Sequence, residues 1–237
     1  MSDTSAVNLP VVLVPGLLCS ARLYAEQIPA LWQFGPVTVA DHTRDDTMTS
    51  IARRILAAAP PRFALAGLSM GGYIALEITR QAPERVARLA LLDTAARAES
   101  PEQTKGRQRV IELAKAGRFA EVPDLAFPVF VHRNRHGDTA LKTIVRAMAE
   151  ETGAEAFLRQ EAAIIARADA RAGLAAIKCP ALVLVGDGDE LTPPHLSQET
   201  AAGIRGSRLA VIPDCGHLST LEQPAAVNAA LIAWMQG

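Results

Sequence analysis

The sequence predicts an α/β fold built on a mainly parallel six-stranded sheet with helices on both faces. Three observations support this prediction. Short apolar runs recur six times along the chain. The segments between these runs carry apolar residues at helical spacing. A long helical stretch, residues 94–178, separates the fourth run from the fifth and predicts an addition to the sheet.

The predicted strands are almost continuous in apolar side chains. Strands of a parallel sheet have this composition because crossover helices bury both of their faces. The predicted strands are Pro10–Pro15, Pro36–Ala40, Phe63–Leu68, Arg88–Asp93, Ala181–Gly186 and Arg208–Ile212.

The predicted helices show one apolar stripe each. In the first, the stripe consists of Tyr24, Ile28 and Leu31. Pro29 is expected to interrupt or bend this helix, so its regular part should precede that residue. The last helix starts at Pro224, since proline is well accepted in a first helical turn. Its apolar stripe should close the core of the protein.

The stretch at residues 94–178 is too long for a single crossover connection. Its pattern is helical, with one stripe through Val110 and Leu113 and another through Leu141, Val145 and Met148. We therefore expect residues 1–93 and 179–237 to form the core and residues 94–178 to form a helical cap on it.

Composition excludes several classes of function. Lys and Arg number 24 against 25 Asp and Glu, a formal net charge of -1, which argues against binding to nucleic acid or to anionic membranes. The longest uncharged stretch, Thr4–Ala21, contains two prolines at positions 10 and 15 and is expected to be a buried strand, not a membrane span. With no signal-like N-terminus and three widely spaced cysteines, a cytoplasmic location and reduced thiols are expected.

Gly67-Leu68-Ser69-Met70-Gly71 directly follows the third predicted strand and directly precedes a helical segment. A serine on such a tight strand-to-helix turn projects its hydroxyl above the carboxyl end of the sheet, and the flanking glycines leave room for the close backbone. Capping of the following helix would be the simpler role for Ser69. The glycines on both sides favour a nucleophile.

A serine nucleophile needs a base and an orienting acid, and both residue types follow later strands. The fifth strand is followed by Gly186-Asp187-Gly188-Asp189-Glu190 and the sixth by Pro213-Asp214-Cys215-Gly216-His217. The order Ser69, Asp189, His217 is the order of the α/β-hydrolase triad. Of the other histidines, His42, His132, His136 and His195 lack this context.

The chain resembles α/β-hydrolase-fold proteins of the capped esterase and lipase-like branch over nearly its whole length. The resemblance is carried by PGLLCSARLY, GLSMGG, VGDGDELTPP and CGHLSTLEQP, in that order. It implies that Ser69 is the nucleophile, His217 the general base and then acid, and Asp189 the orienting acid. Asp93, at the end of the fourth strand, is an alternative, because some members carry the acid there.

The resemblance also implies two backbone donors for the developing oxyanion. These are the N–H groups of Met70, directly after the nucleophile, and of Leu17, in the loop after the first strand. Many members carry His-Gly in that loop, whereas this chain has Pro15-Gly16. Relatives often have a hairpin before the first strand, but few residues precede it here, so six parallel strands are expected.

These residues predict a serine hydrolase, a carboxylesterase, that cleaves a small or medium carboxylic ester as its small-molecule substrate. No metal or cofactor is implied by any motif. Alternatives are a same-fold carbon–carbon bond hydrolase, amidase, lyase or perhydrolase, or a non-catalytic ligand receptor. Apolar residues between Phe119 and Val131 could line the substrate pocket, and the basic run His132–His136 could bind a substrate carboxylate or form a solvated face. The natural substrate and the oligomeric state stay open.

Overall fold

The structure is a computed structural model that describes residues 8–237. The first seven residues, on which the expectation about a signal sequence partly rests, lie outside the described part. A single six-stranded sheet has the order β2-β1-β3-β4-β5-β6. All five strand pairs are parallel, which confirms the predicted sheet. The strands are β1 (Val11–Val14), β2 (Val37–Val39), β3 (Phe63–Leu68), β4 (Val86–Leu92), β5 (Ala181–Gly186) and β6 (Arg208–Ile212).

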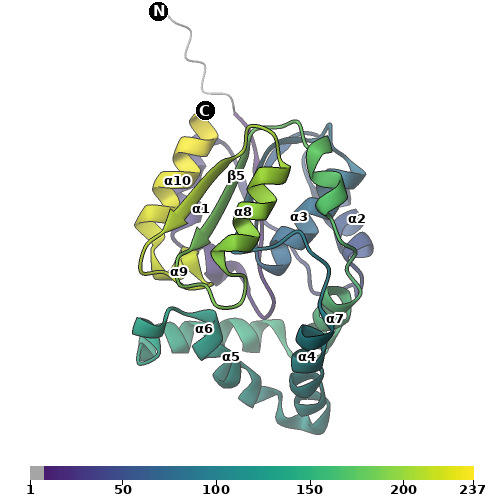
Figure 1. The fold of residues 1–237 in the computed structure, drawn as a ribbon, viewed down its shortest axis with the longest axis vertical. Helices are drawn as coiled ribbons and strands as arrows, with labels where there is room; N and C mark the ends of the chain where they lie inside the picture. Colours follow the sequence, from purple (N-terminus) through teal and green to yellow (C-terminus); the bar gives the residue numbers. More distant parts are fainter. Residues whose placement is uncertain (1–7) are drawn as a thin grey trace, which may run out of the picture.

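Helices cover both faces of this sheet (Figure 1). The α-helices are α1 (Gln27–Leu31), α2 (Met48–Ala58), α3 (Met70–Gln81), α4 (Pro101–Leu113), α5 (Val122–Phe130), α6 (Thr139–Thr152), α7 (Ala154–Ile165), α8 (Pro194–Gly203), α9 (Ser219–Glu222) and α10 (Pro224–Gln236). Short helical turns are η1 (Ala21–Tyr24), η2 (Trp32–Phe34), η3 (Ala114–Arg118), η4 (Phe119–Glu121), η5 (Arg133–Arg135) and η6 (Arg171–Ala176).

Two apolar clusters pack against the sheet, one on each face, and a third, smaller cluster joins Leu18 to helices beyond the sheet. Alternate residues of β1 belong to opposite clusters, since successive side chains of a strand point to opposite faces. Val11 and Leu13 pack with residues of α1 and α10. Val12 and Val14 pack with residues of α2 and α3. This double burial explains why the strands are continuously apolar in sequence.

The first helical segment differs from the prediction. Only the short turn η1 precedes Pro29, and the α-helical turn α1 includes this proline, starting at Gln27. A proline in the first turn is tolerated because the N–H that it lacks would have no partner within the helix. Tyr24 and Leu31 are nevertheless fully buried, as the apolar stripe predicted.

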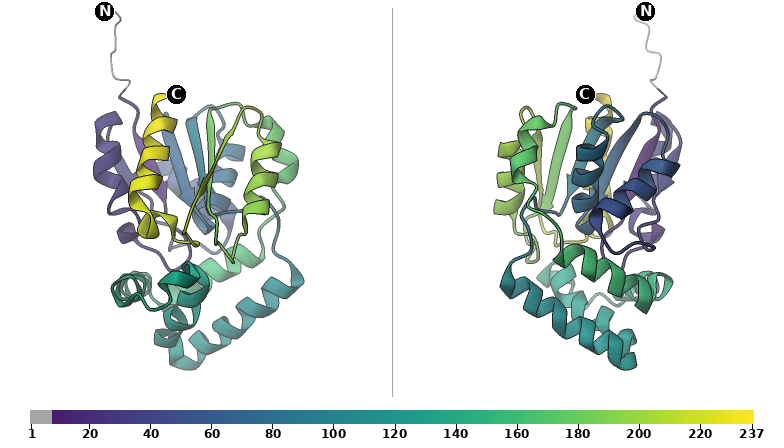
Figure 2. Two further views of the ribbon diagram at one scale, coloured as in Figure 1. Left: turned by 60° about the vertical axis from the view of Figure 1, so that its left-hand side comes forward. Right: turned by 90° about the vertical axis from the view of Figure 1, so that its right-hand side faces the viewer.

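Helices α4, α5, α6 and α7 gather at one end of the sheet (Figures 1 and 2). This is the end at which the parallel strands finish, because Leu18, in the loop after β1, bonds Gln160 of α7 there. Buried Leu141, Val145 and Met148 of α6 join the same apolar cluster as α10. We call helices α4 to α7 the helical layer; the division of the chain into a core and a cap stays a prediction.

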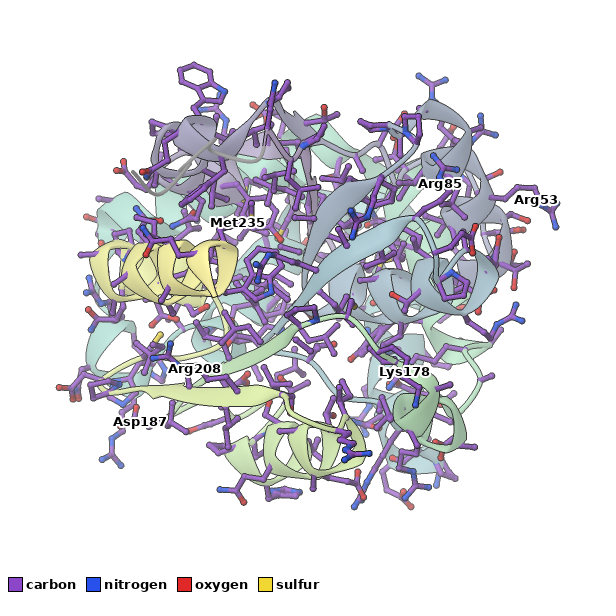
Figure 3. The ribbon with its side chains drawn as sticks, turned by 90° about the horizontal axis from the view of Figure 1, so that it is seen from above. Arg53, Arg85, Lys178, Asp187, Arg208 and Met235 are labelled. Atoms are coloured by element: carbon purple, nitrogen blue, oxygen red, sulfur yellow. The ribbon has the colours of Figure 1, made fainter. Side chains whose placement is uncertain are left out.

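The opposite end of the sheet is closed by polar contacts of the loops. Figure 3 views this end from above, with Arg85, Lys178 and Arg208 labelled. The Arg85 guanidinium donates to the carbonyl oxygens of Leu56, Ala59 and Pro60 at distances of 2.9, 2.8 and 2.8 Å. These bonds satisfy carbonyls left free at the end of α2. Within residues 8–237, no helix combines the length and apolar character that a membrane crossing requires.

Candidate active site

Ser69 occupies a strained turn between β3 and α3. Its backbone has φ 55° and ψ -115°, a region that residues other than glycine rarely adopt. The turn is held by the Ser69 N–H donating to Leu92 O at 2.9 Å and by the Thr94 hydroxyl donating to Ser69 O at 2.8 Å. The serine side chain makes no capping hydrogen bond to α3, so helix capping does not explain this residue.

The two glycines of the turn allow the backbone to pack tightly. A Cβ atom on Gly67 would lie 2.1 Å from Gly71 O, and one on Gly71 would lie 2.0 Å from Val14 O. Both distances are far below van der Waals contact, and the atoms met are backbone atoms that cannot turn aside. Glycine is therefore required at both positions to place α3 against the ends of β1 and β3.

Asp189 and His217 meet above the ends of β5 and β6. The His217 Nδ1 atom lies 2.8 Å from Asp189 Oδ2. The other carboxylate oxygen accepts the N–H groups of Leu191 and Thr192, both at 2.9 Å. The Thr192 hydroxyl donates to Asp189 Oδ2 at 2.7 Å. These donors fix the carboxylate in one orientation toward the imidazole ring.

Burial and charge have opposite effects on the pKa values of Asp189 and His217. Burial disfavours the charged form of Asp189, but the adjacent His217 ring and the hydrogen bonds outweigh it and lower the pKa of Asp189 below its ordinary value. Burial likewise disfavours the charged form of His217, but the charge of Asp189 prevails and raises the pKa of His217 above its ordinary value of 6.5. The arrangement favours an ionised carboxylate beside a basic imidazole.

Asp93, the alternative acid, has different partners. It is fully buried, and its carboxyl accepts the Gly186 N–H at 3.0 Å and a hydrogen bond from the Ser219 hydroxyl. Burial and the nearby charge of Asp189 raise the pKa of Asp93 well above its ordinary value. The structure brings Asp189, and not Asp93, within hydrogen-bonding distance of His217. Asp187 instead accepts the Cys215 N–H at 3.2 Å, a bond that links the loop after β5 to the loop after β6.

Ser69 and His217 border one cavity of about 340 Å³ beneath the helical layer. Among residues 8–237, the hydrogen bonds of the His217 ring go to Asp189 and Thr192, and none joins it to Ser69. Such catalytic bonds are often long without substrate and shorten when it binds. A larger cavity, of about 450 Å³, lies between α3 and residues 167–177, and none of the three candidate residues lines it.

The loop after β1 forms another wall of the cavity through Gly16, Leu17 and Leu18. Within the described chain, neither the Leu17 N–H nor the Met70 N–H has a hydrogen-bond acceptor. Met70 is the first residue of α3, where N–H groups have no partner in the helix and stabilise negative charge. Both N–H groups thus remain available as donors.

The loop that carries His217 is anchored to the helical layer by contacts that the sequence did not reveal. The N–H groups of His217 and Leu218 donate to Phe130 O, at the end of α5, at 3.1 and 3.0 Å. Buried Glu222 accepts the N–H groups of Gly216, Leu218 and His132 at 3.1, 3.2 and 2.7 Å. The GHLSTLEQP motif contains this glutamate, but only the fold shows its partners.

Of the predicted pocket residues, Leu125 and Phe130 line the cavity with Ser69. Phe127 and Val131 pack in the core, and Phe119 packs on Phe157 with ring centroids 5.6 Å apart. The basic run at residues 132–136 is not part of the cavity wall. Within it, Arg135 forms an ion pair with Asp138 at 3.2 Å.

The cavity has one apolar and one polar wall. Helix α5 contributes the apolar wall, including Val122, Leu125 and Val129, and the polar wall includes Arg107 with Glu99 and Glu161. In residues 8–237, no group of three or more His, Cys, Asp or Glu side chains is arranged to hold a metal ion. The site presents a serine, an imidazole–carboxylate pair and two free N–H donors.

A parallel sheet with crossover helices, carrying Ser69, Asp189 and His217 at its carboxyl end, defines the α/β-hydrolase fold. Comparison with known proteins agrees, because the model of the alpha/beta hydrolase family matches residues 11–230. The chain therefore belongs to the alpha/beta hydrolase family, and it is an enzyme of the hydrolase class, as the sequence resemblance predicted.

Several relatives are known by name or by structure. The chain is 27% identical to a Variovorax paradoxus protein named as carbamate hydrolase RutD, covering 95% of this chain and 91% of the relative. It is 28% identical to a pimeloyl-acyl-carrier-protein methyl ester esterase of Aromatoleum aromaticum, covering 76% and 77%. A solved thermophilic esterase from Thermogutta terrifontis, described as malate bound, superposes with a TM-score of 0.87 at 30% identity, covering 96% and 89%.

Proposed function

We propose that the protein is a serine hydrolase that cleaves a small or medium carboxylic ester through an acyl-enzyme intermediate. The observation that carries the proposal is the 2.8 Å contact between His217 Nδ1 and Asp189 Oδ2 at a cavity that Ser69 also lines. A carboxylate on Nδ1 keeps the proton there and leaves Nε2 free to accept one from a serine hydroxyl.

In the first half of the reaction, Ser69 Oγ attacks the ester carbonyl carbon while His217 Nε2 takes its proton. The Asp189 carboxylate stabilises the imidazolium that forms. The oxyanion accepts hydrogen bonds from the N–H groups of Leu17 and Met70, which have no other acceptor within residues 8–237. The imidazolium then protonates the leaving alcohol as the carbon–oxygen bond breaks.

In the second half, a water molecule attacks the acyl-enzyme and gives its proton to His217. The second tetrahedral intermediate uses the same two N–H donors. Its collapse returns the proton to Ser69 Oγ and releases the carboxylic acid. The strained turn at Ser69 supports this cycle because it holds the hydroxyl at the cavity without tying it to the helix.

The two walls of the cavity suggest the kind of ester. Apolar side chains of α5 suit an alkyl or aromatic portion of the substrate. On the other wall, Arg107 Nε donates to Glu99 at 2.6 Å and Nη1 donates to Glu161 at 2.9 Å, which leaves three of its five N–H groups without an acceptor in residues 8–237. Glu99 also pairs with Arg167, so two carboxylates neutralise two guanidinium groups here. Because its charge is already balanced, the Arg107 guanidinium suits a neutral carbonyl or hydroxyl oxygen of the substrate better than a further carboxylate. Two of the three relatives reported above are named esterases, which supports an ester as the cleaved group.

Labelling with a fluorophosphonate probe, followed by mass spectrometry of the modified peptide, tests the nucleophile. We expect modification at Ser69, its loss in His217→Ala, and a fall of about 10⁴-fold or more in kcat for ester hydrolysis in Ser69→Ala. Ser197→Ala is the matched control, since Ser197 is a fully buried serine outside the cavity. Retained hydrolysis in Ser69→Ala would refute the proposal.

A substrate panel separates the ester hydrolase from the other chemistries of the fold. It contains carboxylic esters of increasing chain length, a carbamate, an amide, a vinylogous diketone, and hydrogen peroxide with acetate. We expect the highest kcat/KM for esters of short or medium chain. Binding of an ester without turnover or labelling would point to a ligand receptor.

A further inference from the structure

The loop after β1 is strained and held from outside. Leu18 has φ 61°, a left-handed conformation that costs a leucine roughly 1–3 kcal/mol unless its surroundings enforce it. Two buried polar side chains contact the residues on either side of Leu17. One is His42, from the loop after β2, and the other is Gln160, from helix α7 of the helical layer.

His42 acts on the peptide group between Gly16 and Leu17. Its Nε2 atom lies 2.9 Å from Gly16 O. The Gly16 carbonyl and the Leu17 N–H belong to one planar trans peptide, so they point in opposite directions. A donor that fixes the carbonyl on one side therefore fixes the N–H on the other, where the Leu17 N–H is free and Leu17 lines the cavity.

Gln160 acts on the next peptide group. The Leu18 N–H donates to Gln160 Oε1 at 3.2 Å, across 142 positions of sequence. Gln160 is fully buried, as expected for a polar side chain with a specific partner. The contact joins the helical layer directly to the loop that carries one of the proposed oxyanion donors.

The short distance between the two side chains limits the hydrogen bonds that they can form at the same time. Gln160 Nε2 lies 3.0 Å from His42 Nε2, and the Leu18 N–H requires the amide oxygen of Gln160 to face it. To bond the Gly16 carbonyl, His42 Nε2 must carry a proton, whereas to accept a hydrogen bond from the Gln160 NH₂ group it must carry none. His42 can therefore bond Gly16 or Gln160, but not both. When His42 Nε2 carries the proton, it donates to Gly16 O and forms no hydrogen bond with Gln160 Nε2, while Gln160 Oε1 still accepts the Leu18 N–H. Both contacts to the loop are then kept.

We propose that Gln160 and His42 are positioning residues that hold the Gly16–Leu18 loop so that the Leu17 N–H faces the oxyanion. Helix α7 thereby contributes to catalysis as well as to the cavity roof. The catalytic part of this inference rests on the proposed ester hydrolysis, whereas the holding of the loop does not.

Hydrogen exchange followed by mass spectrometry tests the holding of the loop independently of activity. In Gln160→Leu, we expect amide exchange in peptides that span residues 16–19 to be at least about tenfold faster than in the wild type. Gln27→Leu is the matched control, because Gln27 is equally buried and bonds Thr220 O instead of this loop. Unchanged exchange at residues 16–19 in Gln160→Leu, or an equal change in Gln27→Leu, would overturn the proposal.

Kinetics test the consequence for catalysis. Removing an oxyanion donor costs about 10²- to 10³-fold in kcat, and a displaced donor keeps part of its effect. We expect Gln160→Leu to lose about 10- to 100-fold in kcat with KM changed less than about threefold. Affinity for a boronic acid, which forms a tetrahedral adduct with Ser69, should fall with kcat/KM, while affinity for the product acid should not.

A second variant, His42→Phe, keeps the test decisive if Gln160→Leu does not fold. It removes the Gly16 contact and should show the same split between kcat and KM and the same faster exchange. Wild-type kcat and boronic acid affinity retained in both folded variants would refute the positioning role. If the wild-type protein neither hydrolyses esters nor reacts with the fluorophosphonate, the proposed function fails, and the exchange data alone decide whether Gln160 and His42 hold the loop.

Discussion

Replacing Asp189 by asparagine separates the electrostatic role of this residue from its shape. Asparagine can keep an oxygen toward the N–H groups of Leu191 and Thr192, which now donate at 2.9 Å. Its NH₂ group then faces His217 Nδ1, where the carboxylate oxygen stood at 2.8 Å. To accept a hydrogen bond from this NH₂ group, Nδ1 must be unprotonated, so the ring proton moves to Nε2. Nε2 can then no longer accept the proton of the Ser69 hydroxyl.

The expected cost follows from this change of tautomer. Serine hydrolases with the wrong tautomer lose about 10⁴-fold in kcat, which corresponds to about 5 kcal/mol of transition-state stabilisation. The fold should persist, because two backbone bonds of Asp189 survive. The assay is steady-state hydrolysis of the best ester of the panel, with the melting temperature measured on the same samples.

Asp93→Asn is the matched comparison, since both residues are buried carboxyl groups at the carboxyl end of the sheet. An asparagine at position 93 can still accept the Gly186 N–H and contact Ser219, and it matches the neutral form that burial favours for Asp93. We expect its kcat to stay within about tenfold of the wild type. A loss below about tenfold in Asp189→Asn, or a larger loss in Asp93→Asn, would refute the assignment of Asp189 as the orienting acid.

Two further predictions concern pH and packing. Because the charge of Asp189 outweighs burial and raises the pKa of His217 above 6.5, and because the base must be neutral, kcat/KM should fall as the pH drops, with a midpoint above 6.5. A profile from about pH 5 to 9 checks this, and a midpoint below 6.5 would contradict it. In Gly71→Ala, the new Cβ would meet Val14 O at 2.0 Å, so the free energy of unfolding should fall by about 2 kcal/mol or more in denaturant titration. Gly106→Ala, in helix α4 with no atom within 4 Å of the added Cβ, should instead gain up to about 1 kcal/mol; equal stabilities would contradict the packing argument.

The sheet was predictable because each strand carries its own signal. Phe63–Leu68, Ala181–Gly186 and Arg208–Ile212 were expected with the bounds that the structure has, since a run of apolar residues between turns depends only on local sequence. The first helical segment was predicted wrongly. Whether a proline ends a helix or lies in its first turn depends on where the helix begins, and no capping signal marks Gln27.

The candidate site was predictable where its residues lie in the turns and loops that follow strands. Ser69, Asp189 and His217 do so, and the structure places the last two in contact. The choice between Asp189 and Asp93 needed the fold, because both follow strands and only the hydrogen-bond partners differ. Gln160 was not noticed, and His42 was considered only as a possible base, for a similar reason: they lie 118 positions apart and neither belongs to a motif.

The attachment of the His217 loop to Phe130 O and Glu222 limits how the enzyme can admit its substrate. Because the N–H groups of His217 and Leu218 bond the end of α5, any movement of that helix away from the sheet would also move His217, the proposed general base. We therefore expect α5 to keep its place against the His217 loop when substrate enters the cavity. Helix α5 also cannot be exchanged alone. A chimaera that takes α5 from a relative would need the matching His217 loop from the same relative, since otherwise the position of the His217 imidazole relative to Ser69 would change.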